Sequence, residues 1–307
     1  MQAFDAVVIG GGPAGATAAL YLLRAGVRTA LVEKLTDGGQ VLMTSELENY
    51  PGFPEGIQGF ELADKLTAHL AQYPLERFQA EVKAIEPGEG VHRVVLDDEV
   101  IEARAVVIAS GAKYKKLNVP GEEAYAGRGV SYCAMCDGNF FRGKVVAVVG
   151  GGNSALEEAL YLARLVERIH LIHRREDFRG LKCYQDKCFV HPKINVHRST
   201  VVEEIVGDDA GVNGVALKRV DTGEKTTLDV DGVFLFVGFD PIMDYVPEAV
   251  KRDARGLKVD LEMRTSVPGI FAAGDVISKN CRQVATAVGD GATAATAAFA
   301  YLEQLDA

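Results

Sequence analysis

Two cysteines separated by two residues, Cys133 and Cys136, stand directly before an acidic residue, Asp137. Such a pair can close a small disulfide ring and often has a lowered thiol pKa, so it can cycle between dithiol and disulfide. Asp137 is then placed to move a proton to or from a sulfur. The alternative is half of a zinc site, which needs further ligands nearby. The next cysteines, Cys183 and Cys188, begin 183 − 136 = 47 positions later in C-x4-C spacing, so the sequence favours redox chemistry.

The chain also has two glycine-rich turns, each between an apolar run and a helical stretch. A dinucleotide pyrophosphate binds at a helix N-terminus, where free backbone N–H groups and the helix dipole favour negative charge. Glycine is needed because a side chain would block the phosphate or the tight turn. We therefore predict two dinucleotide sites. The residues that fill the G-x-G-x-x-[GA] pattern are Gly10, Gly12 and Gly15, then Gly150, Gly152 and Ala155.

The residue that ends the second strand of each unit indicates which dinucleotide binds. Glu33 can accept hydrogen bonds from ribose hydroxyls, as in an FAD or NAD site. The equivalent residue of the second unit is His173, followed by Arg174, Arg175 and then Arg179. An arginine cluster would bind a 2′-phosphate, so the first unit suits FAD and the second NADPH. The alternative is a solvent-exposed basic loop on an acidic protein.

The elements that must position these residues form the same series twice: strand, glycine turn, helix, strand. The distance from first glycine to ribose-side residue is equal in both, 33 − 10 = 23 and 173 − 150 = 23. The expected ranges are Phe4–Ile9, Ala14–Arg24 and Thr29–Val32, then Val145–Val149, Ser154–Leu165 and Ile169–Ile172. Short strands are expected in Val82–Asp97 and Val201–Leu228, crossovers at Lys115–Gly121 and Gly238–Pro241, and a final helix in Gln283–Leu305.

Composition narrows the class of protein. The 307 residues suffice for two domains, and 48% are hydrophobic. A net charge of −10 argues against a nucleic-acid partner unless a local basic patch compensates. Five cysteines do not indicate a framework of structural disulfides. Since neither a secretory signal nor an apolar run of about 18 residues is found, we expect a soluble, cytoplasmic protein without membrane contact.

Two dinucleotide units with a C-x-x-C just ahead of the second resemble the bacterial-type, low-molecular-weight thioredoxin reductases of the class II pyridine nucleotide-disulfide oxidoreductases. The likeness covers essentially the whole chain. Matching segments are Gly10–Gly15, Gly39-Gln40, Glu48–Gly52, Ala109–Ala112, Cys133–Gly138, Gly150–Glu158, His173–Arg175 with Arg179, Gly269–Val276 and Arg282-Gln283.

The resemblance implies an α/β fold of two Rossmann-like dinucleotide-binding domains, the second inserted into the first. Residues 1–114 and 244–307 would bind FAD, and residues 115–243 would bind NADPH and carry the C-x-x-C. The implied FAD residues are Gly10, Gly12, Pro13, Ala14, Gly15, Glu33, Lys34, Gly39, Gln40, Asn49, Ala109, Gly111, Gly274, Asp275, Arg282, Gln283 and Val284. The implied NADPH residues are Gly150, Gly152, Asn153, Ser154, Ala155, His173, Arg174, Arg175 and Arg179.

The resemblance also implies a relay and a partner. Electrons would pass from NADPH to FAD, then to the Cys133–Cys136 disulfide and on to oxidised thioredoxin. Cys136 would lie nearest the flavin, Cys133 would attack the substrate disulfide, and Asp137 would be the proton donor or acceptor. The two domains would rotate between these steps, and the enzyme would be a homodimer. Phe140 and Phe141 would belong either to the thioredoxin docking surface or to the core.

Two positions depart from the family pattern. Asn139 stands where many relatives carry an aromatic residue, and Ser110 where they usually have threonine. The rival readings are a flavin enzyme with another electron donor or acceptor protein, and a redox-sensing flavoprotein without sustained turnover. The intact His173-Arg174-Arg175 argues against relatives that take electrons from ferredoxin.

Overall fold

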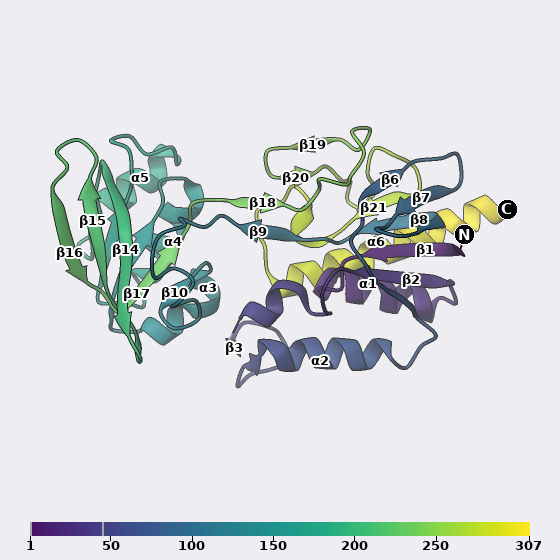
Figure 1. The fold of residues 1–307 in the computed structure, drawn as a ribbon, viewed down its shortest axis with the longest axis horizontal. Helices are drawn as coiled ribbons and strands as arrows, with labels where there is room; N and C mark the ends of the chain where they lie inside the picture. Colours follow the sequence, from purple (N-terminus) through teal and green to yellow (C-terminus); the bar gives the residue numbers. More distant parts are fainter. Residues whose placement is uncertain (1, 45) are drawn as a thin grey trace. The chain divides into compact units, whose positions relative to one another are not determined.

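The computed structural model describes residues 2–44 and 46–307, which divide into two compact units. One unit, here called the split unit, contains the chain up to Lys113 and the segment Asp240–Ala307. The other, the inserted unit, is Tyr114–Phe239. The chain passes between the units at β9 (Ala112–Tyr114) and β18 (Phe239–Pro241), and these two strands pair with each other (Figure 1).

The split unit is built on a seven-stranded sheet in the order β5-β2-β1-β8-β7-β6, with β21 paired to β8. The pairings of β1 with β2 and β8, of β2 with β5 and of β8 with β21 are parallel, whereas β7 pairs antiparallel with β6 and β8. The strands are β1 Gln2–Ile9, β2 Thr29–Glu33, β5 Glu76–Gln79, β6 Ala84–Glu86, β7 His92–Val95, β8 Val100–Ile108 and β21 Ile270–Ala272. The apolar run of β1 is continuous because alternate residues enter the cores on the two faces of the sheet.

Helices α1 (Pro13–Arg24) and α6 (Val284–Asp306) pack against one face of this sheet and against each other. Their close approach depends on small residues, since a Cβ at Gly291 would lie 2.2 Å from the carbonyl oxygen of Ala14. Helix α2 (Gly59–Leu70) packs on α1 and on the 3-10 helix Gly39–Met43. The remaining short elements are β3 Glu46–Leu47, β4 Ile57–Gln58, β19 Arg252–Asp253, β20 Gly256–Leu257 and the 3-10 helix Gly274–Val276.

The inserted unit has a five-stranded, wholly parallel sheet in the order β10-β17-β11-β12-β13. One face packs against three helices and the other against an antiparallel sheet of three strands. The parallel strands are β10 Val130–Ser131, β11 Val145–Val149, β12 Arg168–Ile172, β13 Ile194–His197 and β17 Gly232–Leu235. The helices are α3 Ala134–Asp137, α4 Asn153–Leu162 and α5 Lys182–Phe189, and the antiparallel strands are β14 Thr200–Asp208, β15 Gly211–Arg219 and β16 Lys225–Asp229. A 3-10 helix, Gly138–Phe141, follows α3.

The expected α/β fold with two parallel-sheet units is confirmed. The predicted end of the helix after the second glycine turn is wrong, because α4 ends at Leu162 and not at Leu165. The backbone N–H groups of Leu165 and Val166 both donate to the Leu162 carbonyl, and the Leu165 carbonyl accepts from Gly143, so the chain leaves the helix there. Helix propensity at Leu165 is therefore overridden by a tertiary contact.

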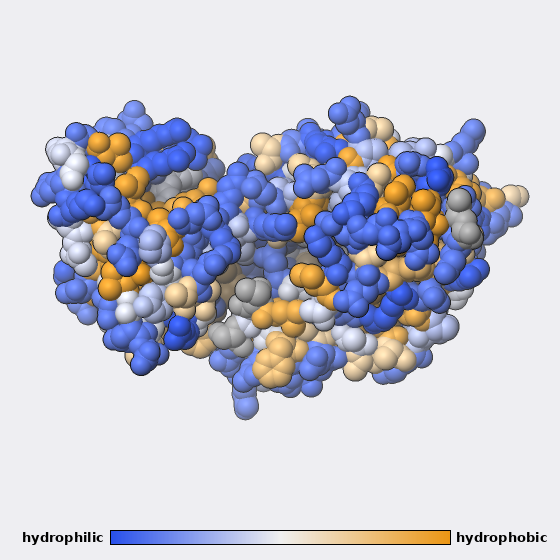
Figure 2. Space-filling view, in the orientation of Figure 1, coloured by the Kyte–Doolittle hydropathy of each residue, from blue (hydrophilic) through white to orange (hydrophobic). Residues whose placement is uncertain are grey.

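Hydrophilic residues cover most of the visible face of each unit, with apolar patches between them (Figure 2). Among the described residues, none of the helices combines the length and the apolar character that crossing a bilayer requires.

Candidate functional site

The two motif cysteines form a disulfide at the start of the short helix α3. The Cα atoms of Cys133 and Cys136 lie 5.3 Å apart, and both residues are half-buried. Cys133 is the N-cap of α3, and its Sγ accepts a hydrogen bond from the backbone N–H of Cys136 over 3.1 Å. A backbone donor at a helix start favours a thiolate, so Cys133 is the better placed sulfur to become one on reduction.

Asp137 is held beside the disulfide by a serine that the sequence analysis missed. The Ser131 hydroxyl donates to Asp137 Oδ2 over 2.6 Å. The same hydroxyl oxygen accepts from the backbone N–H of Cys133 over 3.1 Å. Ser131 is buried at the end of β10, and no motif marks a serine at this distance before a C-x-x-C. It links the candidate proton carrier to the backbone of the candidate nucleophile.

The sequence analysis also missed Glu158, which projects from α4 toward α3. Its carboxyl group accepts a hydrogen bond from the backbone N–H of Ala134, between the two cysteines. Its Oε2 atom is buried without a hydrogen-bond partner. Burial raises the pKa of Glu158 to about 7, and the neighbouring charge of Glu157 adds to the effect. In sequence, Glu158 looks like an ordinary polar position of a surface helix.

The first glycine turn combines tight packing with open space. A Cβ at Gly10 would lie 2.4 Å from the carbonyl oxygen of Ala109, and one at Gly15 would lie 1.8 Å from the carbonyl oxygen of Gly10. A Cβ at Gly12 would approach nothing closer than the Cα of Gly39, at 3.9 Å. Gly10 and Gly15 therefore serve the packing of strand on helix, while the space above Gly12 fits a pyrophosphate.

Glu33 lies at the end of β2 and faces this turn. Its Oε2 accepts from the backbone N–H of Gly11 over 2.7 Å, and its Oε1 accepts from the N–H of Leu35 over 3.0 Å. Each carboxylate oxygen keeps a further lone pair, so Glu33 can still accept from ribose hydroxyls. Lys34 is not brought to the turn, because its exposed ammonium group pairs with Glu81 over 2.8 Å.

A further turn, Gly274-Asp275, packs against the start of α1. A Cβ at Gly274 would lie 2.8 Å from the Cβ of Ala14. Asp275 Oδ1 is buried without a hydrogen-bond partner, and Lys279 Nζ forms an ion pair with it over 3.8 Å. Burial raises the pKa of the Asp275 carboxyl group. A buried acceptor that lacks a donor fits a hydroxyl-rich chain such as the ribityl group of FAD.

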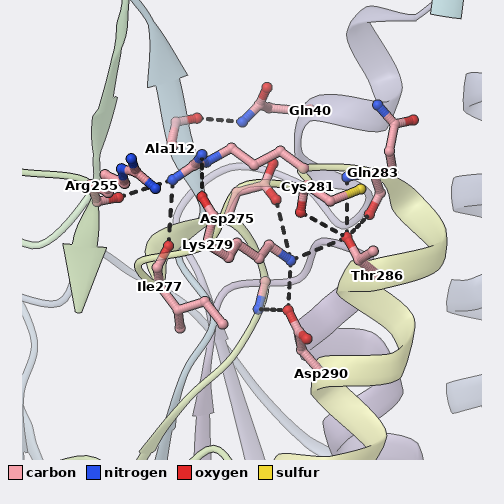
Figure 3. A network of polar contacts seen from close by, with 12 residues as sticks. Gln40, Ala112, Arg255, Asp275, Ile277, Lys279, Cys281, Gln283, Thr286 and Asp290 are labelled. Atoms are coloured by element: carbon pink, nitrogen blue, oxygen red, sulfur yellow. Dashed lines mark hydrogen bonds and ion pairs between the residues drawn. The ribbon is translucent and has the colours of Figure 1, made fainter. Parts of the chain in front are cut away.

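Lys279 and Asp290, both missed in the sequence, tie this turn to α6 (Figure 3). Lys279 Nζ lies 2.6 Å from Asp290 Oδ2, and the same oxygen accepts from the backbone N–H of Gly274 over 3.2 Å. Lys279 Nζ also donates to the Thr286 hydroxyl over 3.2 Å. The ion pair thus fixes the backbone from which Asp275 projects.

The start of α6 is fixed by a capping box between Gln283 and Thr286. The side-chain amide of Asn49 donates to Gln283 Oε1 over 3.0 Å, so two distant predicted residues meet here. Val284 is the first residue of the helix, where backbone N–H groups are not used by the helix itself.

Two further predicted residues bind backbone carbonyl groups near the site. Gln40 donates to the carbonyl of Ala112, and Arg282 donates to the carbonyls of Lys279 and Arg255 over 2.9 and 3.0 Å. A Cβ at Gly111 would have no described atom within 4 Å. Gln40 and Arg282 therefore shape the site through the backbone.

The second glycine turn repeats the division of roles. A Cβ at Gly150 would lie 2.7 Å from the Cβ of Ala155, which is packing, whereas a Cβ at Gly152 would meet no described atom within 4 Å. Asn153 Oδ1 accepts from the backbone N–H of Leu181 over 2.7 Å, and Ser154 is exposed at the start of α4. The loop that ends at Leu181 is thereby folded onto the turn.

His173 and the arginines that follow it differ in burial. The imidazole is buried against Phe178, with ring centroids 4.6 Å apart, and a Cβ at Gly151 would lie 2.3 Å from it. Its pKa is lowered mainly by burial, with the arginine charges adding to the effect. Arg174, Arg175 and Arg179 are all exposed. The backbone N–H of Arg179 donates to the Gly151 carbonyl over 2.8 Å, so the backbone of one of these exposed arginines lies at the open glycine turn.

The remaining cysteines lie outside these groups. Cys188 is buried, donates to the Leu156 carbonyl and has a pKa raised to about 11 by burial. Cys183 on α5 and Cys281 are exposed thiols. In residues 2–44 and 46–307 no group of three or more metal-binding side chains is found.

The two candidate docking aromatics differ. Phe141 is buried and packs edge-on against Phe234, with centroids 5.1 Å apart, so it belongs to the core. Phe140 is 41% exposed and stays available to a partner.

Comparison with known proteins agrees with this geometry. The family model described as pyridine nucleotide-disulphide oxidoreductase matches residues 4–291. This chain belongs to that family. A thioredoxin reductase of Listeria monocytogenes is 43% identical over 98% of this chain and 95% of its own length, and one of Bacillus subtilis is 41% identical over 98% and 96%. The crystal structure of thioredoxin reductase from Streptococcus pyogenes is 44% identical, covers 99% of both chains and superposes with a TM-score of 0.94.

Proposed function

We propose that this chain is an NADPH-dependent flavoprotein thioredoxin-disulfide reductase. The observation that carries the proposal is the Cys133–Cys136 disulfide on a helix of the same unit that holds an open glycine turn and the exposed Arg174, Arg175 and Arg179. The pair can accept two electrons, and the cations suit the 2′-phosphate of NADPH. The family membership and the names of the relatives support the same activity.

The proposal assigns one cofactor to each unit. The split unit would hold FAD at Gly12, Glu33 and Asp275, where the structure offers open space and carboxylate acceptors. The inserted unit would hold NADPH at Gly152 and the arginine cluster. Bound FAD supplies a two-electron carrier between NADPH and the disulfide. The site residues inferred from the resemblance belong to this proposal, with Lys34, Gln40 and Arg282 acting on the protein backbone or surface.

The cysteines carry the chemistry to the protein substrate. Two electrons break the bond between Cys133 and Cys136. The Cys133 thiolate, stabilised by the Cys136 N–H, attacks a sulfur of oxidised thioredoxin, and Cys136 then displaces reduced thioredoxin to restore the enzyme disulfide. Asp137, oriented by Ser131, gives and takes the proton at the sulfurs. Overall, NADPH, one proton and the thioredoxin disulfide yield NADP⁺ and the thioredoxin dithiol.

The oligomeric state and the cellular location are part of the same proposal. We propose that the enzyme is a cytoplasmic homodimer. The free thiols of Cys183, Cys188 and Cys281 support a reducing compartment, and the dimer follows from the family resemblance. Light scattering on the eluting protein measures its mass, and a value near the 32.9 kDa of a single chain would contradict the dimer.

The experiment that tests the activity follows new thiols on thioredoxin. Purified enzyme is mixed with oxidised thioredoxin and either NADPH, NADH or reduced ferredoxin, and thioredoxin thiols are counted with a chromogenic disulfide. The proposal expects stoichiometric thiol formation with NADPH and a far slower reaction with the other two donors. Equal rates with ferredoxin, or no thiols with any donor despite a reducible flavin, would contradict it.

A further inference from the structure

The helix α3, which carries the redox-active cysteines, contacts a carboxyl group that has no role in the proposed relay. Glu158 projects from α4 and accepts a hydrogen bond from the backbone N–H of Ala134, the residue that follows Cys133. Its Oε2 atom is buried and has no hydrogen-bond partner. A buried carboxyl oxygen without a donor costs free energy, so such a group needs an explanation.

Covalent geometry limits the distance between this carboxyl group and the sulfur. The nitrogen of Ala134 is bonded to the carbonyl carbon of Cys133, so Cys133 Sγ lies within about 5 Å of that nitrogen. A hydrogen bond from the nitrogen adds about 3 Å. The carboxyl group is therefore within about 8 Å of Cys133 Sγ. Two negative charges at this separation, one of them on a buried carboxyl group, repel each other and favour protonation of one of them.

The other titratable groups of the elements packed on α4 do not neutralise Glu158. Glu157, next to it on α4, is exposed, hydrogen-bonds with Tyr184 of α5 and disfavours a second negative charge. Cys188 of α5 is a buried thiol whose pKa is raised to about 11, so it is uncharged.

The sheet side of α4 is also uncharged. β11 is apolar throughout, and Ile169 and Leu171 of β12 are the side chains that enter the helix-side core. His170 lies between them, pairs with His197 over 2.9 Å and has a pKa lowered to about 4 mainly by burial, so it is neutral. On α3, the groups that change charge during the reaction are Asp137 and the two cysteines.

We propose that Glu158 is a positioning residue of the disulfide couple, which binds a proton when the Cys133–Cys136 bond is reduced and so sets how readily Cys133 becomes a thiolate. Two electrons break the S–S bond. One proton reaches one sulfur through Asp137 and makes a thiol, the Cys133 sulfur stays a thiolate, and a second proton from solvent neutralises Glu158. Oxidation releases both protons. The inference rests on the proposed function, since it assumes that the pair cycles.

The pKa of about 7 places this proton in the physiological range. At higher pH the oxidised enzyme carries an ionised Glu158, whose charge opposes thiolate formation. At lower pH the group is already neutral and has no such effect. Removing the charge should therefore stabilise the reduced form only at high pH.

The test is a redox titration of the holoenzyme in dithiothreitol buffers at pH 8.5 and pH 5.5, with reduced cysteines counted by maleimide labelling and mass. The variant is Glu158→Gln, which keeps a carbonyl acceptor for the Ala134 N–H but cannot ionise. The matched control is Glu157→Gln on the same helix. Thermal unfolding and the flavin spectrum report whether each variant is folded and loaded.

At pH 8.5 we expect the equilibrium constant for reduction to be about tenfold larger in Glu158→Gln than in the wild type, a shift of about 30 mV. At pH 5.5 the two should agree within about twofold, and Glu157→Gln should stay within about twofold of wild type at both pH values. Equal constants at pH 8.5, or an equal difference at both pH values, would overturn the inference.

A second measurement needs only the wild type to fold. Infrared difference spectra at pH 8.5 should gain the C=O stretching band of a protonated carboxylic acid when the disulfide is reduced. A spectrum without that band would also overturn the inference. Failure of the proposed function is distinguishable, because a disulfide that titrates as expected would then give no turnover with NADPH and thioredoxin.

Discussion

The hydroxyl group of Ser131 donates to Asp137 Oδ2 over 2.6 Å while its oxygen accepts from the backbone N–H of Cys133 over 3.1 Å. These two hydrogen bonds connect Asp137, the proposed proton carrier, with Cys133, the proposed nucleophile, through the Ser131 side chain. It also means that the orientation of Asp137 depends on a residue that lies outside the C-x-x-C-D motif.

Replacing Ser131 with alanine should lower kcat with thioredoxin about tenfold and leave KM for NADPH within about twofold, because one hydrogen bond to a charged group is lost and none of the proposed NADPH-binding residues is changed. Steady-state kinetics at several thioredoxin concentrations measure both. Ser131→Thr keeps the hydroxyl group and should restore most of the rate. An unchanged kcat in the alanine variant would show that Asp137 does not need this partner.

The same glycine-to-alanine change should have three different outcomes. Gly12→Ala meets little protein, since its nearest neighbour is 3.9 Å away, and should fold but lose flavin. Gly152→Ala meets no described atom within 4 Å and should keep flavin while KM for NADPH rises about tenfold or more. Gly15→Ala, with a contact of 1.8 Å to backbone, should fail to fold normally. Flavin content, KM and circular dichroism distinguish them, and a Gly12→Ala protein with full flavin would refute the assignment.

The exposed Arg174, Arg175 and Arg179 should select NADPH over NADH. Replacing all three with glutamine removes charge-assisted hydrogen bonds to the 2′-phosphate, so KM for NADPH should rise about 10- to 100-fold while that for NADH changes little. Arg168→Gln, an exposed arginine at the start of β12, serves as the control for lost surface charge. A triple variant with unchanged preference would indicate that these residues are only a solvated basic loop.

Glu158 should also make stability depend on pH. Its folded-state pKa is about 7 against 4.5 for the free side chain, so the folded protein binds the proton more tightly than the unfolded chain. The wild type therefore loses stability relative to Glu158→Gln as pH rises from about 4.5 to about 7, by up to about 3 kcal/mol. Melting temperatures at pH 5 and pH 8 measure this. A gap between the two proteins that does not widen with pH would contradict the raised pKa.

Much of the architecture follows from local sequence. The β1 run and the turn at Gly10 have the pattern of a buried parallel strand leading into a helix, and a Cβ at Gly15 would clash with the carbonyl oxygen of Gly10 in the same turn. The clash of a Cβ at Gly10 with Ala109 is instead a tertiary contact. The arginines after His173 are also predictable from local sequence, because the loop that carries them directly follows the predicted strand. The sequence did not indicate that these arginines are exposed whereas His173 is buried, because the imidazole is covered by Phe178 and Gly151 in the folded chain.

The supporting residues were not predictable for a common reason. Glu158 serves α3 from a different helix, and Asp290 serves the Gly274 turn from α6, so each role arises from tertiary contacts between distant segments. Their residue types carry no signal, because acidic side chains at these spacings usually face solvent. Phe141 illustrates the opposite error. An aromatic residue close to a reactive motif can be mistaken for a docking residue, but Phe141 lies in the core.

The central claim is that electrons from NADPH reach thioredoxin through the Cys133–Cys136 pair. The most direct test is NADPH oxidation by the purified enzyme with oxidised thioredoxin, comparing wild type with Cys136→Ser and with the exposed-thiol control Cys183→Ser. The account predicts sustained turnover in wild type and Cys183→Ser, and loss of turnover in Cys136→Ser while NADPH still bleaches the flavin. Turnover at the wild-type rate in Cys136→Ser would contradict it.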